Sequence, residues 1–313
     1  MSDNNASWER EVITQLAEAS LREQRRARRW GIFFKLLTFS YIAALFYMYG
    51  DADLSNVHIN EKHTALVELN GVIADEEIAS ADNIVTALRD AFENKNSAGV
   101  ILRINSPGGS PVQSGYIYDE IRRLRKENPD TPLYAVVTDI CASGGYYIAS
   151  AADKIYADKA SIVGSIGVRM DNFGFVDAIN KLGIERRTLT AGENKALLDP
   201  FLPENEKAKA HMQNMLTEIH QQFIDSVKQG RGDRLDTSVE GIFSGLIWTG
   251  ETAVKIGLVD ELASTSYVAR EVIGEEVIVD YTLQDDLLER FAQRLGSTVA
   301  QVISTQLLAT TPR

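Results

Sequence analysis

The hydroxyl of Ser143 is the side chain whose neighbours best suit it to act as a nucleophile. A strand-like run, residues 133–137, precedes it, and an apolar, helix-like run follows it. A serine at such a junction can lie on a tight turn with its hydroxyl exposed, while the free N–H groups at the start of the helix face the carbonyl that it attacks. Gly144 and Gly145 allow a substrate backbone to come close. This pattern favours acyl transfer by a nucleophilic serine.

The same stretch is also compatible with a closely packed strand–helix turn in which the serine has no chemical role. It is not the G-x-S-x-G elbow of the α/β-hydrolases, because Cys141 occupies the position of the first glycine. Cys141 is the only cysteine, so the chain forms no intramolecular disulfide, and cysteine usage does not indicate a compartment. Both interpretations of Ser143 remain open on these residues alone.

A second glycine pair, Gly108-Gly109, follows the buried strand-like run 99–104. Ser110 suits the N-cap of the next helix, and Pro111 suits its first position. Because a strand that ends in Gly-Gly before a capped helix exposes backbone N–H groups, this turn can stabilise a developing oxyanion. The alternative is an ordinary turn between a strand and a helix.

A nucleophilic serine needs a general base, and histidine, the usual one, is scarce in this chain. His58 and His63 lie in a polar stretch before the first predicted strand. His211 and His220 are nine residues apart on a predicted helix, which places them on opposite faces. No histidine lies in a motif, and neither H-E-x-x-H nor a Cys/His cluster is present for zinc. We therefore expect no metal, and lysine is the base type that remains.

Five short blocks, in this order along the chain, resemble the signal peptide peptidase A (SppA) family of membrane-anchored Ser-Lys serine peptidases. They are Arg103–Ser110 (RINSPGGS), Ala142–Tyr147 (ASGGYY), Gly164–Val168 (GSIGV), Gly192–Lys195 with Asp199–Phe201 (GENK and DPF), and Trp248–Asp260. The similarity spans about residues 64–262. It implies an α/β domain with the Clp-protease/crotonase-like fold of repeated ββα units.

The resemblance also implies a role for individual positions, and it implies no cofactor. By the resemblance, Ser143 is the nucleophile, Lys195 is the general base, and the Ser165 hydroxyl orients the lysine. The implied oxyanion hole consists of the backbone N–H group of Gly144 and that of either Gly108 or Gly109. To act as a base, Lys195 must be neutral near pH 7. Burial among apolar groups favours that state, and we expect residues 196–198 to supply such surroundings. Considered alone, Lys195 would be a solvated surface lysine and Ser165 a turn hydroxyl.

The function that the resemblance implies is a membrane-anchored serine endopeptidase. It would degrade short apolar peptides, such as signal peptides left after cleavage from exported proteins, and would assemble as a ring-shaped homo-oligomer. Two alternatives remain. One is a catalytically silent membrane scaffold on the same fold. The other is a crotonase-type acyl-CoA enzyme, whose paired N–H groups hold a thioester oxygen and which needs no Ser-Lys pair.

An apolar segment, residues 31–49, is close to the length of about 20 residues that a transmembrane helix needs. Five arginines between residues 22 and 29 precede it, and acidic residues follow it, so the positive-inside rule places residues 1–30 in the cytoplasm. We expect a single-pass anchor in the bacterial inner membrane, with the catalytic domain on the periplasmic side. A cleaved signal peptide fits poorly, because the leader is long and charged and no A-x-A site follows.

Strand-like and helix-like runs alternate after this segment, which is the pattern of an α/β domain. Among them we expect helices over residues 80–95, 176–182 and 204–228, and a strand over residues 185–190. The predicted organisation is a cytoplasmic tail (1–30), an anchor (31–49), a linker (50–63), a Ser-Lys peptidase domain (64–282) and a C-terminal tail (283–313), for which an oligomer contact and partial disorder both remain open.

The charge of the chain argues against a nucleic-acid partner. Its formal net charge is −12, although residues 1–50 alone carry seven Lys/Arg and five Asp/Glu. The remainder is therefore strongly acidic, whereas binding to nucleic acid calls for a basic face.

Overall fold

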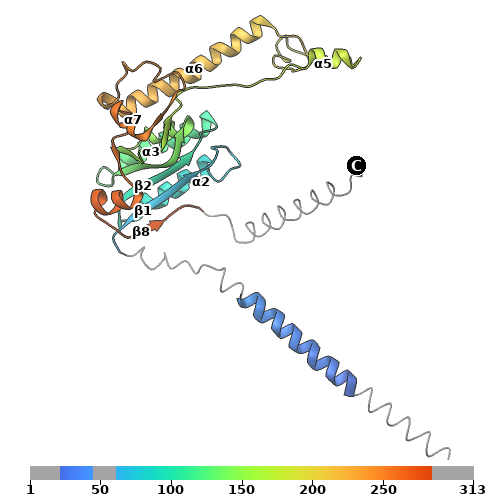
Figure 1. Cartoon of the computed structure of the whole chain (residues 1–313), viewed down its shortest axis with the longest axis vertical. Coiled ribbons are helices and arrows are strands. Elements are labelled where there is room, and N and C mark those ends of the chain that lie inside the picture. The colour runs from blue at the N-terminus through green and yellow to red at the C-terminus, as the bar shows by residue number, and fades with distance from the viewer. Residues whose placement is uncertain (1–21, 45–60, 284–313) are drawn as a thin grey trace, which may run out of the picture. The chain divides into compact units, whose positions relative to one another are not determined.

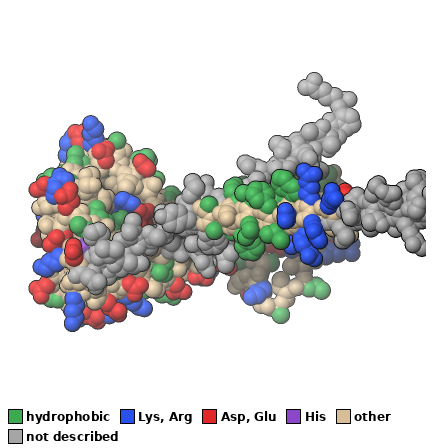
Figure 2. All heavy atoms as spheres, turned by 90° about the horizontal axis from the view of Figure 1, so that it is seen from below, with side chains coloured by type: hydrophobic (Ala, Val, Ile, Leu, Met, Phe, Trp, Pro, Cys, Tyr) green, Lys and Arg blue, Asp and Glu red, His purple; other side chains and the backbone are tan. Residues whose placement is uncertain are grey.

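The computed structural model describes residues 22–44 and 61–283 (Figure 1). The chain divides into two units, Met1–Val57 and His58–Arg313. In the first unit, residues 22–44 form one exposed helix whose basic side chains gather towards one end (Figure 2). Within the described residues, none of the helices has the length and apolar content that a bilayer crossing requires. The predicted anchor, residues 31–49, includes residues 45–49, which lie outside the described residues.

The second unit is built on a mostly parallel β-sheet (Figure 1). Its strands are β1 (His63–Asn70), β2 (Ser97–Ser106), β3 (Leu133–Ala142), β4 (Lys154–Ala157), β5 (Ile162–Gly164), β6 (Ile247–Thr249), β7 (Glu261–Leu262) and β8 (Ile278–Asp280). The main path runs β6-β5-β3-β2-β1-β8, and β4 pairs with β3 and β7. All these pairs are parallel except β5 with β6. Because β1, β2, β3 and β5 end at the same edge, the turns that follow them meet there.

The helices α2 (Ala81–Glu93), α3 (Pro111–Glu127), α4 (Gly144–Ala149), α6 (Glu206–Arg231) and α7 (Gly250–Lys255) alternate with these strands, and α8 (Thr265–Tyr267) and a π-helix, η3 (Val268–Ile273), precede β8. The predicted cap at Ser110 is confirmed, and Ser80, the first residue of the range predicted for α2, caps that helix. The Ser80 hydroxyl accepts from the backbone N–H of Asn83, and the Ser110 hydroxyl accepts from that of Gln113. Such side-chain acceptors satisfy N–H groups that the first turn of a helix leaves free.

The core lies on both faces of the sheet. A large cluster fills the space between the sheet and helices α2, α3, α4 and α6, and a smaller one lies under η3. Alternate residues of one strand point to opposite faces, so Ile101 joins the smaller cluster whereas Val100 and Leu102 join the larger one. Strands buried on both faces are typical of a parallel α/β sheet. The predicted α/β class is therefore confirmed.

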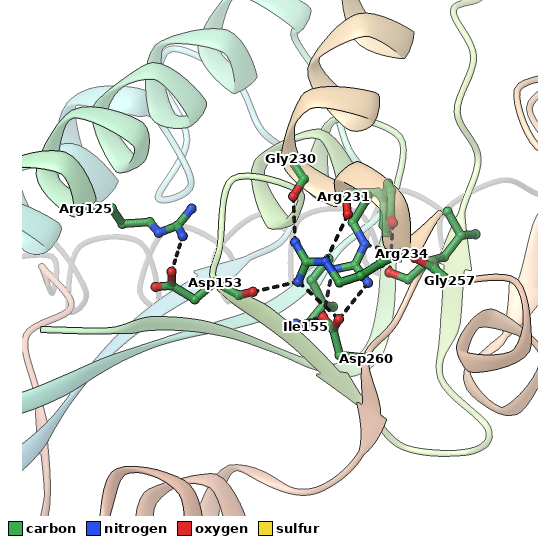
Figure 3. A network of polar contacts seen from close by, with 10 residues as sticks. Arg125, Asp153, Ile155, Gly230, Arg231, Arg234, Gly257 and Asp260 are labelled. Carbon is green, nitrogen blue, oxygen red and sulfur yellow. Dashed lines mark hydrogen bonds and ion pairs between the residues drawn. The ribbon is translucent and has the colours of Figure 1, made fainter. Parts of the chain in front are cut away.

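A buried ion pair ties the C-terminal end of α6 to the sheet (Figure 3). Arg231, 1% exposed, donates to both carboxylate oxygens of Asp260 (2.7 and 3.0 Å), which also accepts from the backbone N–H of Ile155 in β4. Burial opposes ionisation of Asp260. The hydrogen bonds and charge of Arg231, together with the Ile155 N–H and the charge of Arg234, outweigh it and hold the pKa of that carboxyl below its ordinary value. The Tyr146 hydroxyl donates to the Leu258 carbonyl (2.8 Å), so the same region also holds α4.

The end of α6 differs from the sequence-based expectation. We expected this helix to stop before Gly230, but it continues to Arg231. A Cβ at Gly230 would lie 1.9 Å from the carbonyl oxygen of Ser150. The glycine therefore serves close packing of α6 against the end of α4 rather than helix termination.

Residues 170–205, which we call the projecting segment, lie away from the sheet, with helix α5 (Val176–Lys181) near the far end of α6 (Figure 1). None of these residues is buried. The predicted strand at residues 185–190 is wrong: these residues are exposed and have no regular structure. A strand needs a neighbour to hydrogen bond with, and the projecting segment has left the sheet that would provide one.

Candidate active site

Ser143 follows the last residue of β3 and stands at the start of α4. Its φ of 53° and ψ of −122° are values that residues other than glycine rarely adopt. The Ser143 N–H donates to the Gly164 carbonyl (2.9 Å), which holds the turn. Its hydroxyl makes no hydrogen bond to another described residue, and the side chain is half-buried. An open hydroxyl on a strained turn is suited to nucleophilic attack.

Ser165 is the one other non-glycine residue of the described chain with a positive φ (54°). It follows β5, whose last residue, Gly164, pairs with Ala142 of β3. The Ser165 N–H donates to the Leu246 carbonyl (2.7 Å). The two strained residues therefore lie at the ends of adjacent strands, and both were predicted from the sequence as site hydroxyls. Strain of this kind persists where the surrounding structure imposes it, and it clusters at functional sites.

Backbone N–H groups converge beside Ser143. The Gly108 N–H donates to the Ser106 hydroxyl (3.1 Å), whereas the N–H groups of Gly109 and Gly144 have no acceptor among the described residues. A Cβ added to Gly144 would lie 3.3 Å from the Gly109 nitrogen, so the two free donors are close together. This geometry favours Gly109 over Gly108 as the partner of Gly144 in an oxyanion hole.

Two residues that sequence analysis missed, Ile73 and Ser106, hold the glycine turn. The Ile73 N–H donates to the Gly108 carbonyl (3.0 Å), and its own carbonyl accepts from the Ser110 N–H (2.7 Å). The Ser106 hydroxyl donates to the Gly71 carbonyl (2.6 Å). In the sequence, the signal for this contact was an Asn-Gly turn followed by Val-Ile, which does not reveal what the turn touches.

A cavity of about 1060 Å³ opens at this edge of the sheet. Five of the six predicted site residues line it: Ser143, Ser165, Gly108, Gly109 and Gly144. One wall is α3, which contributes Val112 and Tyr116, and another is α6, which contributes Ile219 and Phe223. The cavity can therefore hold a chain with apolar side chains against the serine and the free N–H groups.

Lys195 is the predicted site residue that the structure does not bring to this cavity. It is exposed in the projecting segment and is not among the lining residues. The expected burial beside residues 196–198 is therefore absent in the single chain. The physical reason is that the projecting segment is not packed on the sheet, so its lysine stays in solvent.

Other chemistry at this edge has less support. Cys141 is fully buried, and burial raises the pKa of its thiol above the ordinary value, which disfavours the thiolate that a cysteine nucleophile requires. In the described ranges, 22–44 and 61–283, no three His, Cys, Asp or Glu side chains are grouped so that they could hold a metal ion. The serine hydroxyl is the candidate nucleophile.

A mostly parallel sheet whose carboxyl edge presents a strained serine, two free N–H groups and an open cavity is typical of an α/β protein with a candidate acyl-transfer site. Comparison with known proteins gives the family. The model of "Peptidase family S49" matches residues 125–277. A Methanocaldococcus jannaschii protein named "Putative protease" is 31% identical over 245 residues, which cover 76% of this chain and 77% of that protein. Protease 4 of Haemophilus influenzae is 32% identical over 247 residues, 77% of this chain and 39% of that protein.

The chain therefore belongs to peptidase family S49, the SppA-like serine peptidases, as its sequence blocks predict. Two Brucella proteins named "Na(+)/H(+) antiporter NhaA" are also similar, with 43% identity over 223 residues. The matched region covers 71% of this chain but 30% of each Brucella protein, so the chain spans less than a third of their length.

Proposed function

We propose that this protein is a serine endopeptidase in which Ser143 attacks the peptide carbonyl and the N–H groups of Gly109 and Gly144 bind the oxyanion. The observation that carries this proposal is the open hydroxyl on its strained turn beside two unpaired donors. Because hydrogen bonds already hold the turn, the donors need little reorganisation when negative charge develops. Membership of family S49 supports peptide hydrolysis over the other reactions that an α/β fold can host.

Lys195 is the proposed general base, and we place it at the Ser143 hydroxyl of a neighbouring copy of the chain. Within its own chain it lies outside the cavity. The projecting segment also exposes large apolar side chains, including Phe173 (72%), Leu182 (73%) and Leu189 (102%). Exposed apolar surface of this kind is typical of a protein contact. Covering it with a second copy would desolvate the segment and favour the neutral amine that a base requires.

Two further roles follow from this arrangement. Ser165 lines the same cavity as Ser143, so its hydroxyl is the proposed group that orients the incoming lysine. The proposed assembly is a ring-shaped homo-oligomer. A contact between the projecting segment of one copy and the cavity edge of the next uses two different surfaces, and repeating such a contact gives a ring when the rotation between copies closes.

The proposed substrates are short apolar peptides, such as the remnants of cleaved signal peptides. The apolar side chains of Val112, Tyr116, Ile219 and Phe223 on the cavity walls suit them. Residues 31–49 are the proposed single-pass anchor in the bacterial inner membrane, with residues 1–30 in the cytoplasm and the catalytic domain on the periplasmic side. An anchor would keep the cavity near the bilayer in which such remnants reside.

A serine-directed fluorophosphonate probe tests the nucleophile in the full-length protein. We expect it to label the wild type and Ser238→Ala, an exposed serine outside the cavity, but not Ser143→Ala. A folded wild type that neither reacts with the probe nor cleaves apolar peptides would favour the silent scaffold. A thermal shift produced by acyl-CoA, without labelling, would favour the crotonase-type enzyme.

A further inference from the structure

Helix α3, which forms one wall of the cavity, carries the carboxylate of Asp119. None of the described residues forms an ion pair with it. Val112, Tyr116 and Asp119 follow one another at intervals of four and three residues, and all line the cavity, so they form one face of the helix. The Asp119 side chain is exposed within the described chain and therefore accessible to a ligand in the cavity.

The other residues that line the cavity are mostly apolar or neutral. Tyr147 lines the cavity and stacks on Phe223 of α6, with ring centroids 5.0 Å apart. Gln222, also on the α6 wall, is uncharged. The other charged residue of the lining, Arg169, already pairs with Asp171 (3.3 Å). The cavity thus combines aromatic surface with one unpaired negative charge.

We propose that Asp119 is a specificity-determining residue that binds the Lys or Arg side chain of a peptide substrate. A basic side chain suits both features, because its aliphatic stem packs on apolar surface while its cationic head makes a charge-assisted hydrogen bond. The cavity therefore selects apolar peptides that contain a basic residue. Secretory signal peptides carry such residues in the n-region that precedes their apolar stretch. This inference rests on the proposed peptidase function.

The position of Asp119 along α3 limits where the basic residue lies in the substrate. The helix begins immediately after the glycine turn, and Asp119 is nine residues beyond its cap, Ser110, or about 13 Å along the helix axis. An extended peptide advances about 3.3 to 3.6 Å per residue. For an extended peptide that runs along α3 from the glycine turn, the basic residue is therefore expected about three or four positions from the bond that is cleaved.

Peptide binding to the full-length Ser143→Ala protein tests this inference without requiring turnover. Each peptide of a fluorescent apolar series carries a single lysine, and the position of that lysine differs from one peptide to the next. A matched series has norleucine in place of each lysine. At one position we expect lysine to bind about tenfold more tightly than norleucine, the difference that one charge-assisted contact provides. Asp119→Asn in the same background should abolish that preference, and Asp119→Glu should keep part of it.

The control is Asp90→Asn, which removes an exposed carboxylate from α2, away from the cavity, with the same change in net charge. It should leave the lysine preference unchanged. Equal binding of both series, no binding of either, or a preference that survives Asp119→Asn would overturn the inference. Cleavage by the wild type is measured separately. If the wild type cleaves peptides without any lysine preference, the role of Asp119 is wrong and the peptidase proposal is unaffected. If the protein binds lysine peptides selectively but shows neither turnover nor probe labelling, the peptidase proposal is wrong and the role of Asp119 in binding is unaffected.

Discussion

Gly108 lies directly against the nucleophile and one proposed oxyanion donor, Gly144, and its missing side chain leaves room for both. A Cβ added there would lie 2.7 Å from the Gly144 nitrogen and 2.7 Å from the Ser143 Cβ, and its φ of 96° disfavours any other residue. We expect Gly108→Ala to lower kcat/KM for an apolar fluorogenic peptide by about 100-fold or more, because displacing one oxyanion donor costs about 3 kcal/mol.

Gly99→Ala is the matched control, because Gly99 lies in β2 far from the cavity lining. Its added Cβ would meet the side chain of Ile273 at 3.1 Å, so some loss of thermal stability is expected without a change in kcat/KM. A Gly108→Ala protein that keeps a third or more of wild-type kcat/KM would show that this turn is not part of the oxyanion hole.

The proposed general base, Lys195, is tested by substitution. If Lys195 accepts the Ser143 proton, turnover depends on its amine. Lys195→Ala should leave the fold intact, since the side chain is exposed in the single chain, and should abolish turnover. Ser165→Ala should retain some activity, because its hydroxyl is proposed to orient the lysine without taking part in bond making. A folded Lys195→Ala protein with more than a tenth of wild-type kcat/KM has some other base.

Among the elements, α2 and α3 are joined by an ion cluster next to the cavity wall. Glu120 of α3, buried at 9% exposure, accepts from Arg123 (2.6 Å) and from Arg89 of α2 (2.6 Å). The hydrogen bond from Arg123, acting against burial and together with Arg89, lowers the pKa of Glu120 to about 2. A carboxyl with a lower pKa in the folded state stabilises the fold above its unfolded pKa, and this stabilisation is lost as pH falls towards the folded value.

We therefore expect Glu120→Gln to lower the free energy of unfolding at pH 7 by about 2 kcal/mol, the scale of hydrogen bonds to a charged group. The difference from wild type should shrink as the pH falls from about 4.5 towards 2, because the wild-type carboxyl then becomes neutral as well. Urea unfolding at several pH values measures this. Glu127→Gln, which breaks an exposed pair with Arg123, should cost less than about 0.5 kcal/mol. A constant difference across that pH range would contradict the assignment.

For the whole molecule, the position of Lys195 predicts that active sites form between copies. Ser143→Ala and Lys195→Ala proteins should each be inactive alone. Refolded together in equal amounts, they should recover about a quarter of wild-type activity, because in a head-to-tail ring one contact in four then joins an intact serine to an intact lysine. Sizing chromatography should show the same multimer for all three samples. No recovery in a mixed multimer would place the dyad within one chain.

The proposed anchor is tested by topology in intact cells. External protease added to spheroplasts should attack sites beyond residue 50 and spare a tag at the N-terminus, because the arginines before residue 31 hold that end in the cytoplasm. Lysed spheroplasts, in which the tag is also cleaved, provide the control. Protection of the catalytic domain in spheroplasts would refute the predicted orientation.

Local features of this protein could be derived from the sequence because they depend on neighbouring residues. The caps at Ser80 and Ser110, the buried strand that ends before Gly108 and the strand–helix junction at Ser143 all involve contacts within a few positions of the chain. The motif blocks likewise identified the family and both strained serines. The strand expected at residues 185–190 failed, because pairing depends on a distant neighbour that the local pattern does not specify.

Only the tertiary structure decided how the site is completed. It showed that the Gly108 N–H donates to the Ser106 hydroxyl and that Ile73 holds the Gly108-Gly109 turn by hydrogen bonds. It also showed that Asp119 lines the same cavity as Ser143. These facts depend on which backbone groups other segments have already engaged, and hydrogen bonds between segments remote in sequence leave no periodic signal. The location of Lys195 outside the cavity of its own chain also depends on tertiary packing. Residue types and spacing predict that a lysine is the base, whereas the packing of the projecting segment determines which serine that lysine can reach.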